Sequence, residues 1–137
     1  MLFRSIKLEV DTDPPLGFKT EEQLLLQPYA CYVKCLSLPD LFAGKMHAVL
    51  FRQWQTRVKG RDWFDLEWYV RRAIPLHLDH LGERARQSGH WPQAQPFTAD
   101  ALRSLLGERI DRLDVEQARL DISRLIVDPL QIGRAHV

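Results

Sequence analysis

The residues best suited to chemistry lie between Lys45 and Tyr69, where basic side chains and two aspartates share a short stretch of the chain. Lys45 and Arg52 are seven residues apart, so on a helix they project from nearly the same side. Asp62 and Asp65 are three residues apart, which makes them neighbours on one helical face. Positive charge beside two carboxylates indicates a site that handles phosphate. The cations assigned to phosphate binding are Lys45, Arg52, Lys59 and Arg61.

The charge of this stretch differs from that of the whole chain. From residue 45 to residue 72 there are seven Lys or Arg residues and three acids, a local excess of four positive charges, whereas the chain as a whole carries +1 at pH 7. The simpler interpretation is that these charges form a solvated helix face and that Asp62 caps the first turn of its helix. The spacing alone leaves both interpretations open.

Two helices are expected to position these side chains. Apolar residues recur at three- and four-residue steps and predict a helix from Pro39 to Arg52. A basic loop separates it from a second helix, expected from Asp62 to Arg72. Amphipathic segments farther along the chain predict further helices that start near Pro75, Thr98 and Asp114.

Strands are expected ahead of the helices. Apolar and polar residues alternate from Ser5 to Asp11, which predicts a strand with one buried face. Its other face would carry Glu9 and Asp11, either as two carboxylates offered to a divalent metal or as an ordinary solvated surface. Two further short strands are expected at 24–27 and 29–36. Strands followed by helices predict an α+β fold.

Composition limits the class of protein. A chain of 137 residues has room for one modest domain, and 45% apolar with 27% charged residues is ordinary for a soluble globular protein. The sequence contains no run of eighteen apolar residues, so no membrane-spanning helix is expected, and the first residues lack a signal-peptide pattern. Cys31 and Cys35 are therefore expected to be free thiols in a reducing cytoplasm.

Three segments, in their order and spacing, resemble the AbiEii/AbiGii-type nucleotidyltransferase toxins. They are I-K-L-E-V-D-T-D-P-P, L-S-L-P-D-L-F-A-G-K-M-H-A-V-L-F-R and R-V-K-G-R-D-W-F-D-L-E-W-Y-V. The resemblance implies a polymerase-β-like nucleotidyltransferase sheet joined to a mostly helical C-terminal portion. It also implies a toxin of a bacterial toxin–antitoxin or abortive-infection system, which uses Mg²⁺ to transfer a nucleotide from an NTP to RNA, with tRNA as a candidate acceptor, and which has a cognate antitoxin.

The resemblance implies roles for individual residues. The family's essential lysine maps onto Lys45, which would contact the triphosphate. The later essential aspartate maps onto either Asp62 or Asp65, and the choice stays open. Arg52 and Arg61 would help to bind the triphosphate or would bind RNA phosphates, and Glu9 or Asp11 would lie near the metals.

The sequence departs from the family pattern in one respect. The family places a Gly-Ser and then an Asp-x-Asp ahead of the lysine, and this chain has no Gly-Ser. Its Asp11-Thr12-Asp13 follows the predicted strand and precedes two prolines, so a turn is expected there. The chain is therefore expected to be a fragment that lacks the main Mg²⁺ ligands and is inactive alone.

The expected organisation has three parts. Residues 1–37 would be the end of the nucleotidyltransferase sheet, and residues 38–130 the helical portion that carries the lysine and the R-D-x-x-D motif. Residues 131–137 fit no element and resemble a translated sequencing adapter, so a non-native tail is expected.

Two other functions fit parts of the sequence. A non-catalytic RNA- or protein-binding module would use the basic stretch at residues 52–61 without chemistry. A metal-dependent nuclease would use Glu9, Asp11 and Lys45, but such sites bring the acids and the lysine together on adjacent strands, and Lys45 is expected on a helix.

Overall fold

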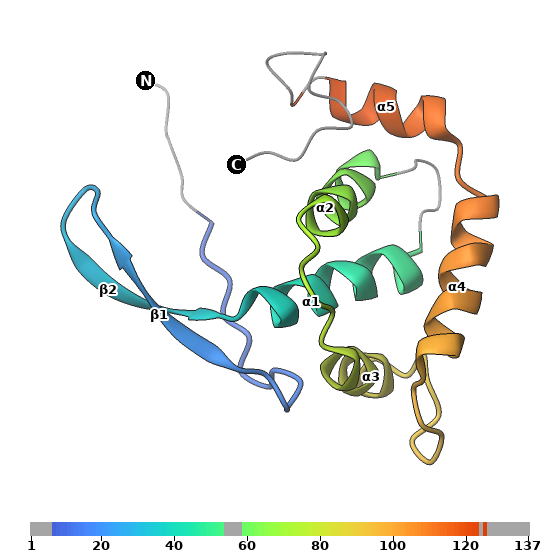
Figure 1. Ribbon diagram of the computed structural model, residues 1–137, viewed down its shortest axis with the longest axis horizontal. Coiled ribbons are helices and arrows are strands. Elements are labelled where there is room, and N and C mark those ends of the chain that lie inside the picture. Colours follow the sequence, from blue (N-terminus) through green and yellow to red (C-terminus); the bar gives the residue numbers. More distant parts are fainter. Residues whose placement is uncertain (1–6, 54–58, 124, 126–137) are drawn as a thin grey trace.

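The chain folds as a small antiparallel hairpin followed by helices, and the computed structural model describes residues 7–53, 59–123 and 125 (Figure 1). Strands β1 (Thr20–Leu25) and β2 (Cys31–Leu36) form the hairpin and lead directly into α1 (Leu38–Phe51). The later helices of the described part are α2 (Gly60–Arg71), α3 (Leu78–Gln87), α4 (Ala99–Asp111) and α5 (Val115–Ser123). This order confirms the α+β class. Residues 131–137 lie outside the described residues.

The helix predictions are confirmed to within three residues at each start, because the apolar spacing and the capping residues agree. The Thr98 hydroxyl accepts a hydrogen bond from the Ala101 N–H at 3.2 Å, and so caps α4. Asp114 accepts from the Gln117 N–H at 3.0 Å at the start of α5. At α1, Pro39 lies in the first turn, where its missing N–H costs nothing.

The prediction of a strand from Ser5 to Asp11 is wrong for the residues that the structure describes, 7–11. Residues 7–11 form no strand, and the side chains of Leu8 and Val10 are 86% and 76% exposed. Alternating polarity becomes a strand only where a neighbouring strand takes its backbone hydrogen bonds, and in the described ranges β1 and β2 pair only with each other. The strand expected at 24–27 is observed at Thr20–Leu25. Its first four residues, 20–23, are all polar, so they give no hydrophobic pattern that would predict a strand.

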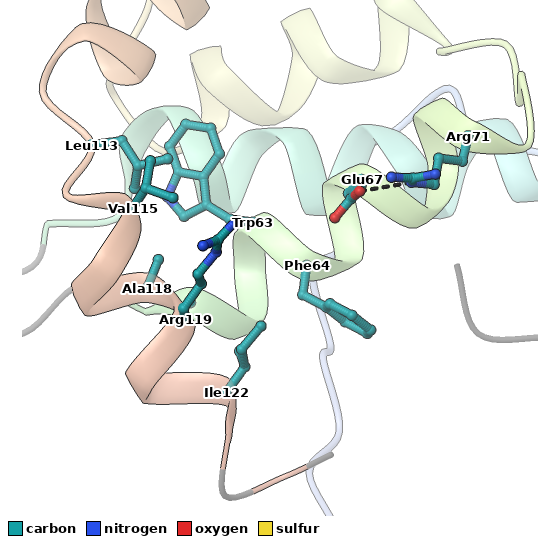
Figure 2. A pocket seen from close by; sticks show the side chains of 10 residues that line it. Trp63, Phe64, Glu67, Arg71, Leu113, Val115, Ala118, Arg119 and Ile122 are labelled. Atoms are coloured by element: carbon teal, nitrogen blue, oxygen red, sulfur yellow. Dashed lines mark hydrogen bonds and ion pairs between the residues drawn. The ribbon is translucent and has the colours of Figure 1, made fainter. Parts of the chain in front are cut away.

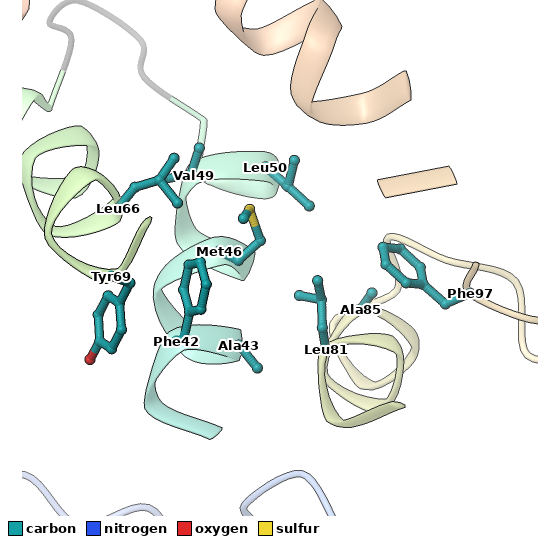
Figure 3. Close-up of a cluster of buried hydrophobic side chains, with 10 residues drawn as sticks. All are labelled: Phe42, Ala43, Met46, Val49, Leu50, Leu66, Tyr69, Leu81, Ala85 and Phe97. Carbon is teal, nitrogen blue, oxygen red and sulfur yellow. The ribbon is translucent and has the colours of Figure 1, made fainter. Parts of the chain in front are cut away.

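The hydrophobic core is organised around α1, which lies between α2 and α3 (Figures 1 and 3). Phe42 stacks on Tyr69 of α2, with ring centroids 4.8 Å apart. The opposite side of α1 faces Leu81 and Ala85 of α3, both fully buried. Packing on two sides thus fixes helix α1, and with it the backbone of Lys45 at the middle of the helix. The core comprises Phe42, Ala43, Met46, Val49, Leu50, Leu66, Tyr69, Leu81, Ala85 and Phe97.

One buried carboxylate joins the hairpin to the helices. Asp40 is 1% exposed, and its Oδ2 accepts hydrogen bonds from the Lys19 N–H at 2.8 Å and the Ser37 hydroxyl at 2.5 Å. Its Oδ1 lies 2.5 Å from His77 Nδ1, just before α3. Burial alone would raise the pKa of Asp40, but the hydrogen bonds from Ser37, Lys19 and His77 together hold it below its usual value of 3.8.

The start of α2 packs closely on α5 at Gly60. A Cβ atom at this position would lie 2.0 Å from the carbonyl oxygen of Ala118, so only glycine fits without moving a backbone. The Gly60 N–H also donates to Asp121 Oδ2 at 3.0 Å. This contact holds the start of α2, and with it the acidic side of the predicted site, against α5.

Replacing Gly60 by alanine should destabilise the protein by roughly 1–3 kcal/mol, because the new methyl group forces α2 and α5 apart. The free energy of unfolding in urea measures the effect. Gly107→Ala is the matched control: it lies inside α4 with no atom within 4 Å of the added Cβ, and alanine is the better helix former by about 0.5–1 kcal/mol. Equal stability of Gly60→Ala and the wild type would contradict the close packing.

The lowered pKa of Asp40 predicts a loss of stability in acid. Since the folded-state pKa lies below the unfolded value, the carboxylate stabilises the fold above about pH 3.8, and this contribution disappears as the pH falls through the folded pKa. Asp40→Asn should therefore cost about 1–3 kcal/mol at pH 7. Urea unfolding at a series of pH values should show the gap to the wild type narrowing below pH 3.8. A gap that does not depend on pH would contradict the assignment.

Candidate functional site

Two ion pairs join α1 to α2, and they use four of the residues that the sequence singled out. Lys45 Nζ lies 2.6 Å from Asp65 Oδ2, and Arg52 Nη1 lies 2.9 Å from Asp62 Oδ2. The spacing of seven along α1 and three along α2 thus brings each cation to one carboxylate. The structure places these four side chains at one interface between two helices.

The two aspartates differ in exposure. The side chain of Asp62 is 7% exposed, so its charge depends on Arg52 for compensation. The side chain of Asp65 is 27% exposed and that of Lys45 is 38% exposed, which leaves both within reach of a ligand. Asp62 lies in the first turn of α2 but does not cap it, since the capping position is Lys59.

A hollow of about 360 Å³ opens beside the Lys45–Asp65 pair. It combines three aromatic rings with two cations and one carboxylate, a set that can stack on a planar ring and bind an anion. Burial raises the pKa of Tyr69 above its usual value, and the nearby Asp65 carboxylate raises it further, so the phenol stays neutral. The lining residues are Lys45, Arg61, Phe64, Asp65, Trp68 and Tyr69.

Lys45 also lines a second hollow, of about 270 Å³. It includes both members of the Arg52–Asp62 pair and the buried Asp40. It also includes Arg84 of α3, which the sequence analysis missed. Arg84 lies 39 residues beyond Lys45, and only the packing of α3 on α1 brings the two together, so no local pattern signals it.

A third hollow, of about 540 Å³, lies between α2 and α5 and contains none of the predicted site residues (Figure 2). Trp63 and Ile122 contribute apolar surface, and Glu67 pairs with Arg71 at 2.6 Å. Its position follows from the packing of α5 on the start of α2.

The remaining predicted residues lie at or beyond the edge of the site. Lys59 is exposed immediately before α2, and Arg61 lines the aromatic hollow. Glu9 and Asp11 lie on exposed coil: Glu9 pairs with Lys7, and Asp11 accepts a hydrogen bond from the backbone N–H two residues later, at 3.0 Å. Part of the basic stretch at 52–61, residues 54–58, lies outside the described residues.

The described residues do not form a metal site. Within the ranges 7–53 and 59–123, no group of three or more His, Cys, Asp or Glu side chains is placed to hold a metal ion. The carboxylates nearest Lys45 are each engaged by a cation or by hydrogen bonds: Asp40, Asp62 and Asp65. These residues therefore do not fit a metal on their own.

No helix in the described part of the chain is long and apolar enough to cross a membrane. Cys31 and Cys35 both carry free thiols, as expected, with Cys31 exposed on the hairpin.

Comparison with known proteins identifies the family. No curated protein and no solved structure matches the chain. The model of one family, described as the nucleotidyl transferase AbiEii toxin of type IV toxin–antitoxin systems, matches residues 2–130. This match covers the hairpin, both helices of the ion-paired site and the helices that follow. The chain therefore belongs to the nucleotidyl transferase AbiEii toxin family.

Proposed function

We propose that this chain carries the lysine–aspartate part of a nucleotidyltransferase site, which transfers a nucleotide from an NTP to an RNA acceptor, with tRNA as the first candidate. The observation that supports this most directly is the 2.6 Å Lys45–Asp65 pair beside an aromatic and basic hollow, in a chain of the AbiEii family.

Lys45 would neutralise the polyphosphate. In nucleotidyl transfer, an RNA hydroxyl oxygen bonds to the α-phosphorus of the NTP, and the bond from that phosphorus to the bridging oxygen breaks, so pyrophosphate leaves. Negative charge builds on the leaving group, and a fixed cation stabilises it. Lys45 is exposed enough to reach a bound triphosphate, while its backbone is held in the middle of α1.

Asp65, rather than Asp62, is the better candidate for the essential aspartate. Its carboxylate reaches the same hollow as Lys45, where it would hold the lysine in place or accept the proton of the attacking hydroxyl. Asp62 is buried and paired with Arg52, which suits a residue that fixes the two helices. Geometry and exposure therefore support Asp65 as our choice between two residues that the spacing left equivalent.

A divalent metal is common to nucleotidyltransferases, and Mg²⁺ is the expected ion. The described residues make no metal site, and the Asp-x-Asp at 11–13 lies on exposed coil. Our proposal is that the chain alone does not catalyse transfer and that Glu9 and Asp11 are at most peripheral to the metals. The hairpin within 1–37 would then belong to the nucleotidyltransferase sheet, and 38–130 to the helical portion.

The basic edge formed by Lys59 and Arg61 is the proposed contact for RNA phosphates. Both residues are exposed where α2 begins, and Arg61 also lines the hollow beside Lys45. RNA would therefore approach from the side on which the triphosphate binds. The proposed setting is the cytoplasm, where NTP, RNA and a cognate antitoxin are all present.

Substitutions at the two ion pairs test this proposal. In the full-length protein that the gene encodes, Lys45→Ala and Asp65→Asn should each lower transfer of a labelled nucleotide from α-³²P-NTP to total RNA by about 10²-fold or more, with little change in stability. Asp62→Asn should instead lower the free energy of unfolding by roughly 1–3 kcal/mol, because it leaves Arg52 without its buried partner.

Arg103→Ala on the exposed face of α4 is the control, since within the described residues Arg103 pairs with the exposed Asp100. Normal transfer by folded Lys45→Ala would refute the assigned role. Binding of RNA with no transfer by any form of the protein would favour the non-catalytic binding module instead.

A further inference from the structure

Arg84 of α3 lies against the middle of α1. A Cβ atom on Gly44 would be 3.6 Å from both Cζ and Nη2 of Arg84, which is ordinary van der Waals contact. Gly44 directly precedes Lys45 in the sequence, and Arg84 lines the 270 Å³ hollow together with Lys45 and Arg52. Three cations, from α1, its C-cap and α3, therefore line one small space.

Arg84 differs from the other two cations because it has no carboxylate partner in the described part of the chain. Lys45 pairs with Asp65 and Arg52 with Asp62, whereas Arg84 forms no ion pair there and its Nε is buried without a hydrogen-bond partner. Leaving a guanidinium group partly buried and unpaired is costly, so such a group is a candidate for an external anion.

The acidic residues of this hollow do not compensate Arg84. Asp62 is engaged by Arg52, and both oxygens of Asp40 are occupied, Oδ2 by Ser37 and the Lys19 N–H and Oδ1 by His77. No carboxylate that lines this hollow therefore compensates the positive charge of Arg84. Its influence also reaches His47, whose pKa is lowered to about 4, first by burial and then by the positive charges of Arg84, His90 and Arg52.

We infer that Arg84 binds the polyphosphate of the nucleotide together with Lys45. This inference rests on the proposed nucleotidyltransferase function, and it adds a cation from α3 to a set that otherwise comes from α1 and α2. A guanidinium group suits this role, since its planar fork can donate two hydrogen bonds to one phosphate group. Lys45 lines both hollows, so a nucleotide with its phosphates near Arg84 would have its base or ribose near the aromatic side.

Binding of inorganic triphosphate to the whole chain, measured by isothermal titration calorimetry, tests this inference. Arg84→Gln should weaken binding at least tenfold without lowering the thermal midpoint, because it removes an unpaired charge rather than a structural ion pair. Arg84→Lys should bind with intermediate affinity, since it keeps the charge but loses the fork. Arg103→Gln, on the exposed face of α4, should bind like the wild type.

Wild-type affinity in Arg84→Gln, or no binding of triphosphate by the wild type, would overturn the inference. If Arg84→Gln does not fold, Arg84→Lys decides, and wild-type affinity in that variant overturns it. Failure here is distinct from failure of the proposed function. If nucleotide transfer depends on Lys45 but triphosphate binding is unchanged in Arg84→Gln, only the inference about Arg84 is refuted. If triphosphate binding requires Arg84 but no nucleotide is transferred to RNA, only the proposed function is refuted.

Discussion

The buried carboxylate of Asp62 fixes how α1 and α2 lie together, and the candidate site depends on that contact. A charge with 7% of its side chain exposed is tolerated only beside an opposite charge, so α2 must begin where Arg52 can reach it. Once that contact is made, Asp65, one turn later, faces Lys45. One ion pair is therefore structural, and it places the second, which is open to ligands.

Other contacts hold the same helices from outside the site. Gly60 lets α5 approach the start of α2, and the core side chains of α1 meet α2 on one side and α3 on the other. Asp40 joins the residue before β1, the residue before α1 and the loop before α3. Because α3 is fixed in this way, Arg84 comes beside Lys45. The same packing that builds the core thus gathers positive charge around one hollow.

The local features of this structure could be predicted from the sequence, and the distant ones could not. Apolar spacing and the caps at Thr98 and Asp114 predict the helices, because capping and amphipathicity act within a few residues. Helical periodicity predicts that Lys45 and Arg52 share one side of their helix and that Asp62 and Asp65 are neighbours, but which cation pairs with which carboxylate follows only from the packing of α1 on α2. The position of Arg84 near Lys45 depends on the packing of α3 against α1, which no sequence periodicity predicts. The failed strand at 7–11 shows that alternation alone cannot supply a partner strand.

The proposed role of this protein depends on contact between Lys45 and the triphosphate of a bound nucleotide. Its most direct test is the rate at which Lys45 reacts with an acylating reagent, read by mass spectrometry with and without NTP, with Lys34 on the exposed face of β2 as the internal reference. We predict that NTP slows acylation of Lys45 severalfold and leaves Lys34 unchanged, and that the nucleoside without phosphates protects neither. Equal reactivity of Lys45 in the presence and absence of saturating NTP would contradict the account.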